Sequence, residues 1–135
     1  MVRVRQALNR IFEILECTDK EISLVFVDDD DMAGINRTYL GRDYPTNVIA
    51  FPLSEGKFGE VNSHVLGDIV ISVETAARDA LEGDIPFEDE VDFLMIHGLL
   101  HLLGYNHEHT SSEVSEQMKH KEQDLFFQLH GYPVE

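Results

Sequence analysis

The segment Met95–His109, MIHGLLHLLGYNHEH, constrains the fold more than any other part of this 135-residue chain. Its apolar residues recur at helical spacing, which predicts a long helix that opens at Pro86 and ends at about Leu103. His97 and His101 are four residues apart, so both imidazoles would lie on one face of that helix, one turn apart. The leucines between the two histidines would pack in the hydrophobic core and anchor this helix there.

The same segment predicts a metal site. Gly104 lets the chain leave the helix, and His107 follows three residues later, where it can return as a third ligand. The pattern H-x-x-x-H-x-x-G-x-x-H has the spacing of the long zinc-binding motif of metzincins. Three neutral nitrogens leave a fourth position open, as in catalytic sites. We therefore predict one divalent ion on His97, His101 and His107, with zinc favoured and other transition metals acceptable.

One residue argues against a conventional metalloprotease. Zincins carry a glutamate directly after the first histidine as general base, and here that position is Gly98. Glu108 and Asp68 are conceivable substitutes, but sequence alone does not place them near the metal. His109 is expected in a loop, and His120 and His130 are expected at the surface.

Composition restricts the partners and the compartment. Acidic residues outnumber basic ones 26 to 10, for a net charge of −16, which disfavours nucleic-acid backbones and favours basic partners. Cys17 is the single cysteine, which excludes an intrachain disulfide and favours a reducing compartment. No apolar run approaches the roughly 18 residues of a membrane span, and the amphipathic start does not read as a secretory leader. We expect a cytoplasmic protein without a membrane partner.

Hydrophobic periodicity predicts an α+β fold in a single domain over residues 1–135. The small mixed sheet would have three to four strands and would be packed by about five helices. The four aspartates 28–31 would cap and charge-complement the helix that follows them. The expected helices are 3–16, 31–40, 73–81, 86–103 and 111–131, and the expected strands are 22–27, 48–53 and 65–72.

Three blocks of sequence carry a family resemblance. They are HGLLHLLGYNH at 97–107, Asn36 followed by PTNVIAFP at 45–52, and LGDIVIS at 66–72. In type and order they are similar to the H-G-x-L-H-L-x-G-Y-D-H, P-T-D/N-V-L-S-F-P and L-G-D-I-x-I-S stretches of the YbeY family of bacterial endoribonucleases. The resemblance covers the chain from about Ile22 to the last helix.

The resemblance implies a single-domain α+β metalloprotein whose three histidines match the family's metal ligands. It implies a role in ribosomal RNA maturation, notably at the 3′ end of small-subunit rRNA, and in ribosome quality control. The expected partners are an rRNA precursor and a basic ribosomal protein or another ribosome-assembly factor, with no role for DNA.

The chain departs from the family pattern at a few positions. Asn106 replaces the usual aspartate, Ala50 replaces a common serine, and Leu40-Gly41-Arg42 stands where the family has arginine, glycine and lysine. Arg42 is our candidate catalytic residue, because a guanidinium suits phosphate. The alternative, that Arg42 only pairs with a nearby carboxylate, stays open.

Our hypothesis is metal-assisted hydrolysis of single-stranded RNA by an endoribonuclease. One alternative is a metallopeptidase-like hydrolase on the same three histidines, which requires a carboxylate near the metal despite Gly98. A second is a non-catalytic ribosome-assembly factor with a structural metal, which requires a fourth protein ligand such as His109.

Overall fold

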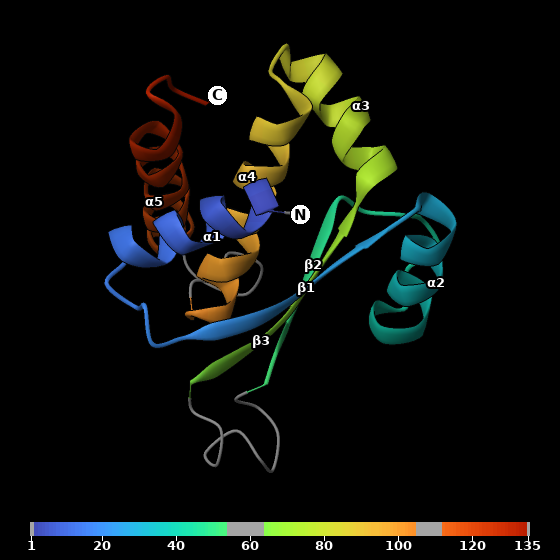
Figure 1. Cartoon of the computed structure of the whole chain (residues 1–135). Coiled ribbons are helices and arrows are strands. Elements are labelled where there is room, and N and C mark those ends of the chain that lie inside the picture. Colours follow the sequence, from blue (N-terminus) through green and yellow to red (C-terminus); the bar gives the residue numbers. More distant parts are fainter. Residues whose placement is uncertain (1, 54–63, 105–111, 135) are drawn as a thin grey trace.

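A computed structural model describes residues 2–53, 64–104 and 112–134, and within them the predicted order of elements is confirmed (Figure 1). In these ranges five helices accompany a three-stranded mixed sheet, so the α+β prediction is correct. The helices are α1 (Val2–Ile14), α2 (Asp29–Leu40), α3 (Val73–Gly83), α4 (Phe87–Leu102) and α5 (Ser112–His130). The strands are β1 (Glu21–Val27), β2 (Val48–Pro52) and β3 (Val65–Ser72).

The sheet has the order β1-β3-β2, with β1 parallel and β2 antiparallel to the central strand β3. Side chains alternate between its two faces. Ile69 and Ile71 join the main core with α1, α4 and α5, whereas Val70 packs with Met32 of α2. Figure 1 shows α2 on one side of the sheet and α1, α4 and α5 on the other. The strand order makes β2 an edge strand, which lies between the two layers of helices.

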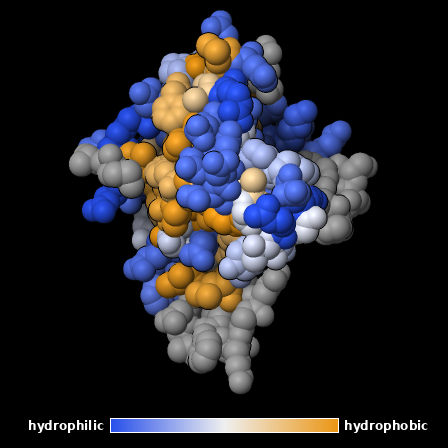
Figure 2. Space-filling view, turned by 90° about the vertical axis from the view of Figure 1, so that its right-hand side faces the viewer, coloured by the Kyte–Doolittle hydropathy of each residue, from blue (hydrophilic) through white to orange (hydrophobic). Residues whose placement is uncertain are grey.

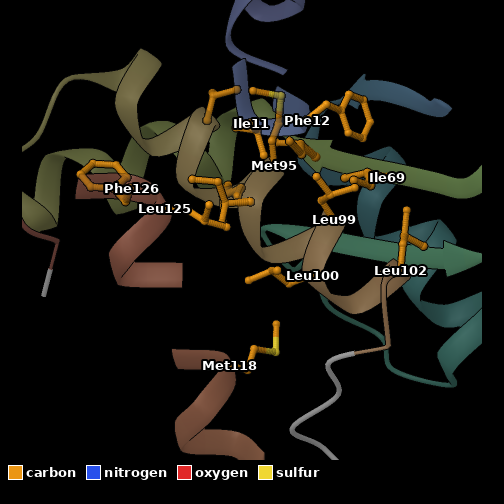
Figure 3. Packing of buried hydrophobic residues seen from close by; sticks show 14 of the residues in the cluster. Ile11, Phe12, Ile69, Met95, Leu99, Leu100, Leu102, Met118, Leu125 and Phe126 are labelled. Carbon is orange, nitrogen blue, oxygen red and sulfur yellow. The ribbon is translucent and has the colours of Figure 1, made fainter. Parts of the chain in front are cut away.

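Helix α4 lies at the centre of the main core. Most of its residues are buried, and it contacts α1, α3, α5, β2 and β3. No helix in the described ranges has both the length and the apolar character to cross a membrane. Figure 3 shows the packing around α4, where Met95, Leu99 and Leu100 meet Ile11 and Phe12 of α1, Ile69 of β3, and Leu125 and Phe126 of α5.

The aspartate run caps α2, as predicted. Asp28 accepts a hydrogen bond of 2.8 Å from the Asp31 backbone amide. Asp29 has a further role, because its carboxylate accepts bonds from two elements beyond α2. The donors are Ser72 Oγ at 2.7 Å, Thr75 Oγ1 at 2.6 Å and Arg78 Nη2 at 2.7 Å. Asp29 therefore ties the start of α2 to the start of α3.

The surface position expected for His130 is wrong, although His120 is exposed as expected. Helix α5 packs antiparallel to α4, so its last residue meets the first turns of α4. The His130 side chain is only 14% exposed, with Nε2 2.9 Å from Asp92 Oδ2 and Nδ1 3.4 Å from Asp89 Oδ1. Long-range pairing of the two helices, which the sequence does not display, removes most of this side chain from solvent.

We predict that Asp29→Ala lowers the free energy of unfolding by about 1 kcal/mol at neutral pH, since three donors lose a partly exposed charged acceptor. Hydrogen bonds from Ser72, Thr75 and Arg78 lower the pKa of Asp29 from 3.8 to about 2. A lowered folded-state pKa means that the contribution is present above about pH 4 and is lost as the pH falls through 2.

Urea unfolding of the wild type and the variant between pH 2 and 7 measures this difference. Asp30→Ala is the matched control, because Asp30 is an exposed neighbour in the same turn and should change stability by less. Equal losses for the two variants, or an Asp29 effect that persists at pH 2, would contradict the assignment.

Candidate metal centre

A cleft of about 500 Å³ lies along the free edge of β2, between the end of α2 and the second half of α4. It brings together three of the residues that sequence analysis selected, namely His97, His101 and Arg42. Its walls come from three separate parts of the chain. They comprise Tyr39, Leu40, Arg42, Thr46, Asn47, Val48, Ile49, Ala50, Phe51, Pro52, His97, Gly98 and His101.

The two helical histidines converge as their spacing predicted. His97 Nε2 and His101 Nε2 are 3.1 Å apart. Two nitrogens that bind one tetrahedral zinc at about 2.0–2.1 Å are separated by about 3.3 Å, so this pair fits a shared ion. The third predicted ligand, His107, lies outside the described residues, as do Glu108 and His109.

Glu122 of α5 supports the histidine pair from behind. Its carboxylate is buried, and Oε1 lies 2.5 Å from Nδ1 of His97. Nδ1–H of a neutral His97 then donates to the carboxylate, which leaves the Nε2 lone pair directed at the cleft. This is the carboxylate–histidine arrangement that orients ligands at metal centres. The two imidazoles, with Glu122 orienting one of them, therefore fit a transition-metal ion.

Sequence analysis did not identify Glu122, although a signal was present. Met118, Glu122 and Leu125 follow the spacing of one helix face, and both apolar neighbours are fully buried. A carboxylate on an otherwise apolar stripe needs a partner. The sequence does not say that this partner is His97.

Gly98 stands where zincins carry the glutamate base, and its lack of a side chain serves the packing of α4 on β3. A Cβ at this position would lie 3.0 Å from Cγ2, 3.1 Å from Cδ1 and 3.2 Å from Cγ1 of Ile69. The Cβ of any other residue here would therefore press on Ile69 of β3, which is fully buried. Asp68 does not line the cleft, and Glu122 contacts the Nδ1 side of His97. No described carboxylate takes the place of the protease base.

Arg42 reaches the cleft because Asn36 shapes the loop that follows α2. Gly41 adopts φ 69°, a left-handed conformation that glycine accepts readily, and the Arg42 amide donates to Asn36 O at 3.3 Å. Asn36 is buried, and its Nδ2 donates to Tyr44 O at 2.7 Å. The Arg42 side chain forms no ion pair with another described residue, which does not support the carboxylate-pairing alternative.

A second group of possible metal ligands was not foreseen. Ligand atoms of Asp89, Asp92 and His130 lie within 4.8 Å of one another at the far end of α4. Arg3 of α1 already occupies this group, with Nη2 2.8 Å and Nη1 3.3 Å from the two Asp92 carboxylate oxygens. Burial raises the pKa of Asp92, although Arg3 acts in the opposite direction. We interpret the group as an ion-pair cluster that joins α1, α4 and α5.

Comparison with known proteins decides the family. The sequence model of the endoribonuclease YbeY family matches residues 2–130. The chain belongs to the YbeY family. An endoribonuclease YbeY from Syntrophus aciditrophicus is 59% identical over 133 residues, which cover 98% of this chain and 83% of the relative. The corresponding protein from Syntrophotalea carbinolica is 48% identical over 126 residues, covering 93% and 84%.

A solved structure has a similar fold. The solution structure of a Thermotoga maritima protein superposes with a TM-score of 0.66 at 27% identity, and it covers 96% of this chain and 80% of its own. The resemblance to YbeY proteins noted in the sequence is therefore confirmed, as is the α+β fold. The family name also supports a hydrolase of the endoribonuclease class.

Substitution of Gly98 tests the close approach of α4 to the sheet. We predict that Gly98→Ala lowers the free energy of unfolding by about 1 kcal/mol or more, because overpacking against Ile69 outweighs the helix propensity gained. Combination with Ile69→Val should recover part of the loss, as measured in a double-mutant cycle by urea unfolding.

Gly34 provides the matched control, since it also lies within a helix but has only Arg37 Nη2, at 3.9 Å, near its would-be Cβ. Gly34→Ala should raise stability by up to about 1 kcal/mol. A stabilising Gly98→Ala would show that α4 and β3 are not in close contact at this point.

Proposed function

We propose that this YbeY-family chain is a metal-dependent endoribonuclease that cleaves single-stranded RNA in rRNA maturation. The observation that carries the proposal is the pair of imidazole Nε2 atoms 3.1 Å apart, backed by the buried Glu122, in a cleft that also holds Arg42. Residues 1–135 would form one catalytic domain, in the cytoplasm. The 3′ end of small-subunit rRNA and ribosome quality control are the finer roles that the family resemblance suggests.

His97 and His101 would hold the ion, with His107 as the third ligand. Zinc is the favoured metal, and other imidazole-binding transition metals are compatible with these ligands. When bound, such an ion supplies an activated water and a Lewis acid for a phosphoryl oxygen. Glu122 would keep the His97 ring in the orientation and tautomer that ligation requires.

Arg42 would bind and orient the RNA backbone. Its guanidinium is always protonated and presents paired donors that match phosphate oxygens. Because the side chain has no carboxylate partner among the described residues, it can face a phosphate group without first breaking an ion pair. At the scissile position this charge would offset the negative charge that develops in the transition state.

The net charge of −16 is compatible with delivery of the substrate by a basic partner. Such a chain binds RNA weakly through long-range electrostatics, whereas it attracts basic proteins. A basic ribosomal protein or another assembly factor would therefore dock on its acidic surface and bring the rRNA precursor to the cleft.

We expect His97→Ala to reduce cleavage of a single-stranded RNA oligonucleotide by roughly a hundredfold or more, since one ligand and the Glu122-backed nitrogen are lost together. Gel analysis of product with purified protein measures the rate, and chelation of the wild type should have a similar effect. Arg42→Gln should give a smaller loss. His120→Ala is the control, because His120 is an exposed histidine of α5.

Cleavage that survives both His97→Ala and chelation would identify a contaminating nuclease and refute the proposal. Cleavage of unstructured peptides without cleavage of RNA would instead favour the metallopeptidase reading.

Glu122→Gln tests the support of the metal site directly. We expect the variant to bind Zn²⁺ about 10- to 100-fold more weakly than the wild type, because a neutral amide no longer holds the His97 N–H as a charged acceptor does. Competition with a fluorescent zinc chelator gives the affinities. Asp124→Asn is the matched control, since Asp124 is an exposed carboxylate of the same helix. Equal affinities for both variants would remove Glu122 from the site.

A further inference from the structure

Tyr39 is an exposed aromatic residue at the rim of the cleft. It lies in the last turn of α2, and 67% of the residue is exposed. Its ring packs edge to face against Phe51 of β2, with centroids 5.3 Å apart and an angle of 66° between the planes. Both residues line the cleft that contains His97 and His101. Phe51 therefore holds one side of the tyrosine ring while much of its surface remains open to solvent.

Packing in the hydrophobic core does not account for the position of Tyr39. Phe51 packs against the small cluster of Met32, Ile49 and Val70, but Tyr39 belongs to neither hydrophobic cluster. The side chain of Leu40 beside it is also exposed, at 48%. Figure 2 views the molecule from the side that carries α2 and shows hydrophobic side chains reaching the surface between hydrophilic ones. Exposed apolar surface at the mouth of a cleft is typical of a ligand-binding site.

The chemistry of the rim fits an unpaired nucleotide. Single-stranded RNA is recognised largely by stacking of splayed bases on aromatic rings, combined with cationic contacts to the backbone. Tyr39 offers a ring whose tilt is set by Phe51, and Arg42 offers a guanidinium three residues further along the chain. The rim thus pairs an open aromatic face with a guanidinium that has no carboxylate partner among the described residues.

We propose that Tyr39 stacks on one base of the single-stranded RNA while Arg42 contacts the backbone, so that the scissile phosphate is positioned at the histidines. This inference rests on the proposed function, and Tyr39 acts here as a substrate-positioning residue. Because every base has a π face, the contact binds single strands without strict sequence preference. A base held in a duplex does not present this face, so the contact also selects unpaired RNA.

Binding without catalysis isolates the stacking contact. The probe is a short RNA that contains 2-aminopurine, whose fluorescence is quenched by stacking, titrated with full-length protein in excess chelator. We expect Tyr39→Ala to raise Kd roughly five- to thirtyfold and to abolish the quenching. Tyr39→Phe should behave as the wild type. Phe127→Ala is the matched control, because Phe127 is an exposed aromatic of α5 outside the cleft.

Two further measurements separate stacking from an effect on folding. Tyr39→Leu keeps an apolar side chain against Phe51 but has no π face, so it should also lose the quenching while its thermal unfolding stays close to that of the wild type. An RNA with abasic sites in place of its bases should bind to the wild type and to Tyr39→Ala equally well.

The outcomes distinguish the two proposals. RNA cleavage that depends on His97, together with unchanged Kd and quenching in Tyr39→Ala, would overturn the stacking role and leave the proposed function standing. Failure of the wild type to bind and to cleave RNA would overturn both. Quenching that disappears in Tyr39→Ala and Tyr39→Leu but persists in Tyr39→Phe and Phe127→Ala is the expected result.

Discussion

The close contact between α4 and β3 is the constraint on which the rest of the structure depends. The absence of a side chain at Gly98 lets the helix approach Ile69, so that the main core forms between them. The helix also contacts the edge strand β2, and His97 and His101 open into the cleft beside that strand. Helix α5 packs on the same helix, and its Glu122 meets His97. The helix itself brings the two imidazoles together, and its packing on β3 sets where this pair meets the cleft.

Much of what the sequence motifs contain serves this packing rather than chemistry. In the block at 66–72, Gly67 is required because a Cβ there would lie 2.2 Å from the carbonyl oxygen of Phe51 on the neighbouring strand. Ser72, the last residue of the same block, caps α3 and donates to Asp29. Asn36 uses its amide to shape the loop that carries Arg42. A family signature thus combines the groups that face the cleft with those that hold the backbone around it.

The sequence predicted the fold class and the histidine pair because both follow from local periodicity. An i, i+4 pair on a helix converges whatever surrounds it, and the apolar spacing of α4 identified the helix. Glu122 was not predicted, and His130 was wrongly expected at the surface. Both environments depend on the register between α4 and α5, which are antiparallel neighbours. That register comes from side-chain packing across the pair, and no pattern within either helix encodes it. The exposed position of Tyr39 likewise depends on how α2 meets β2.

The pairing of basic side chains with carboxylates limits the positive charge that this acidic chain can offer to RNA. Several basic side chains are already engaged with the chain's own carboxylates, among them Arg3 with Asp92 and Arg78 with Asp29. Arg42 is the only lysine or arginine among the described residues of the cleft wall. In the described part of the cleft wall a polyanion meets one cationic side chain, so contacts that need no positive field would add to what Arg42 contributes. Stacking on an aromatic ring is such a contact, and it is far less sensitive to salt than phosphate binding. In the proposed site, shape and stacking would therefore supplement the single guanidinium of the cleft wall.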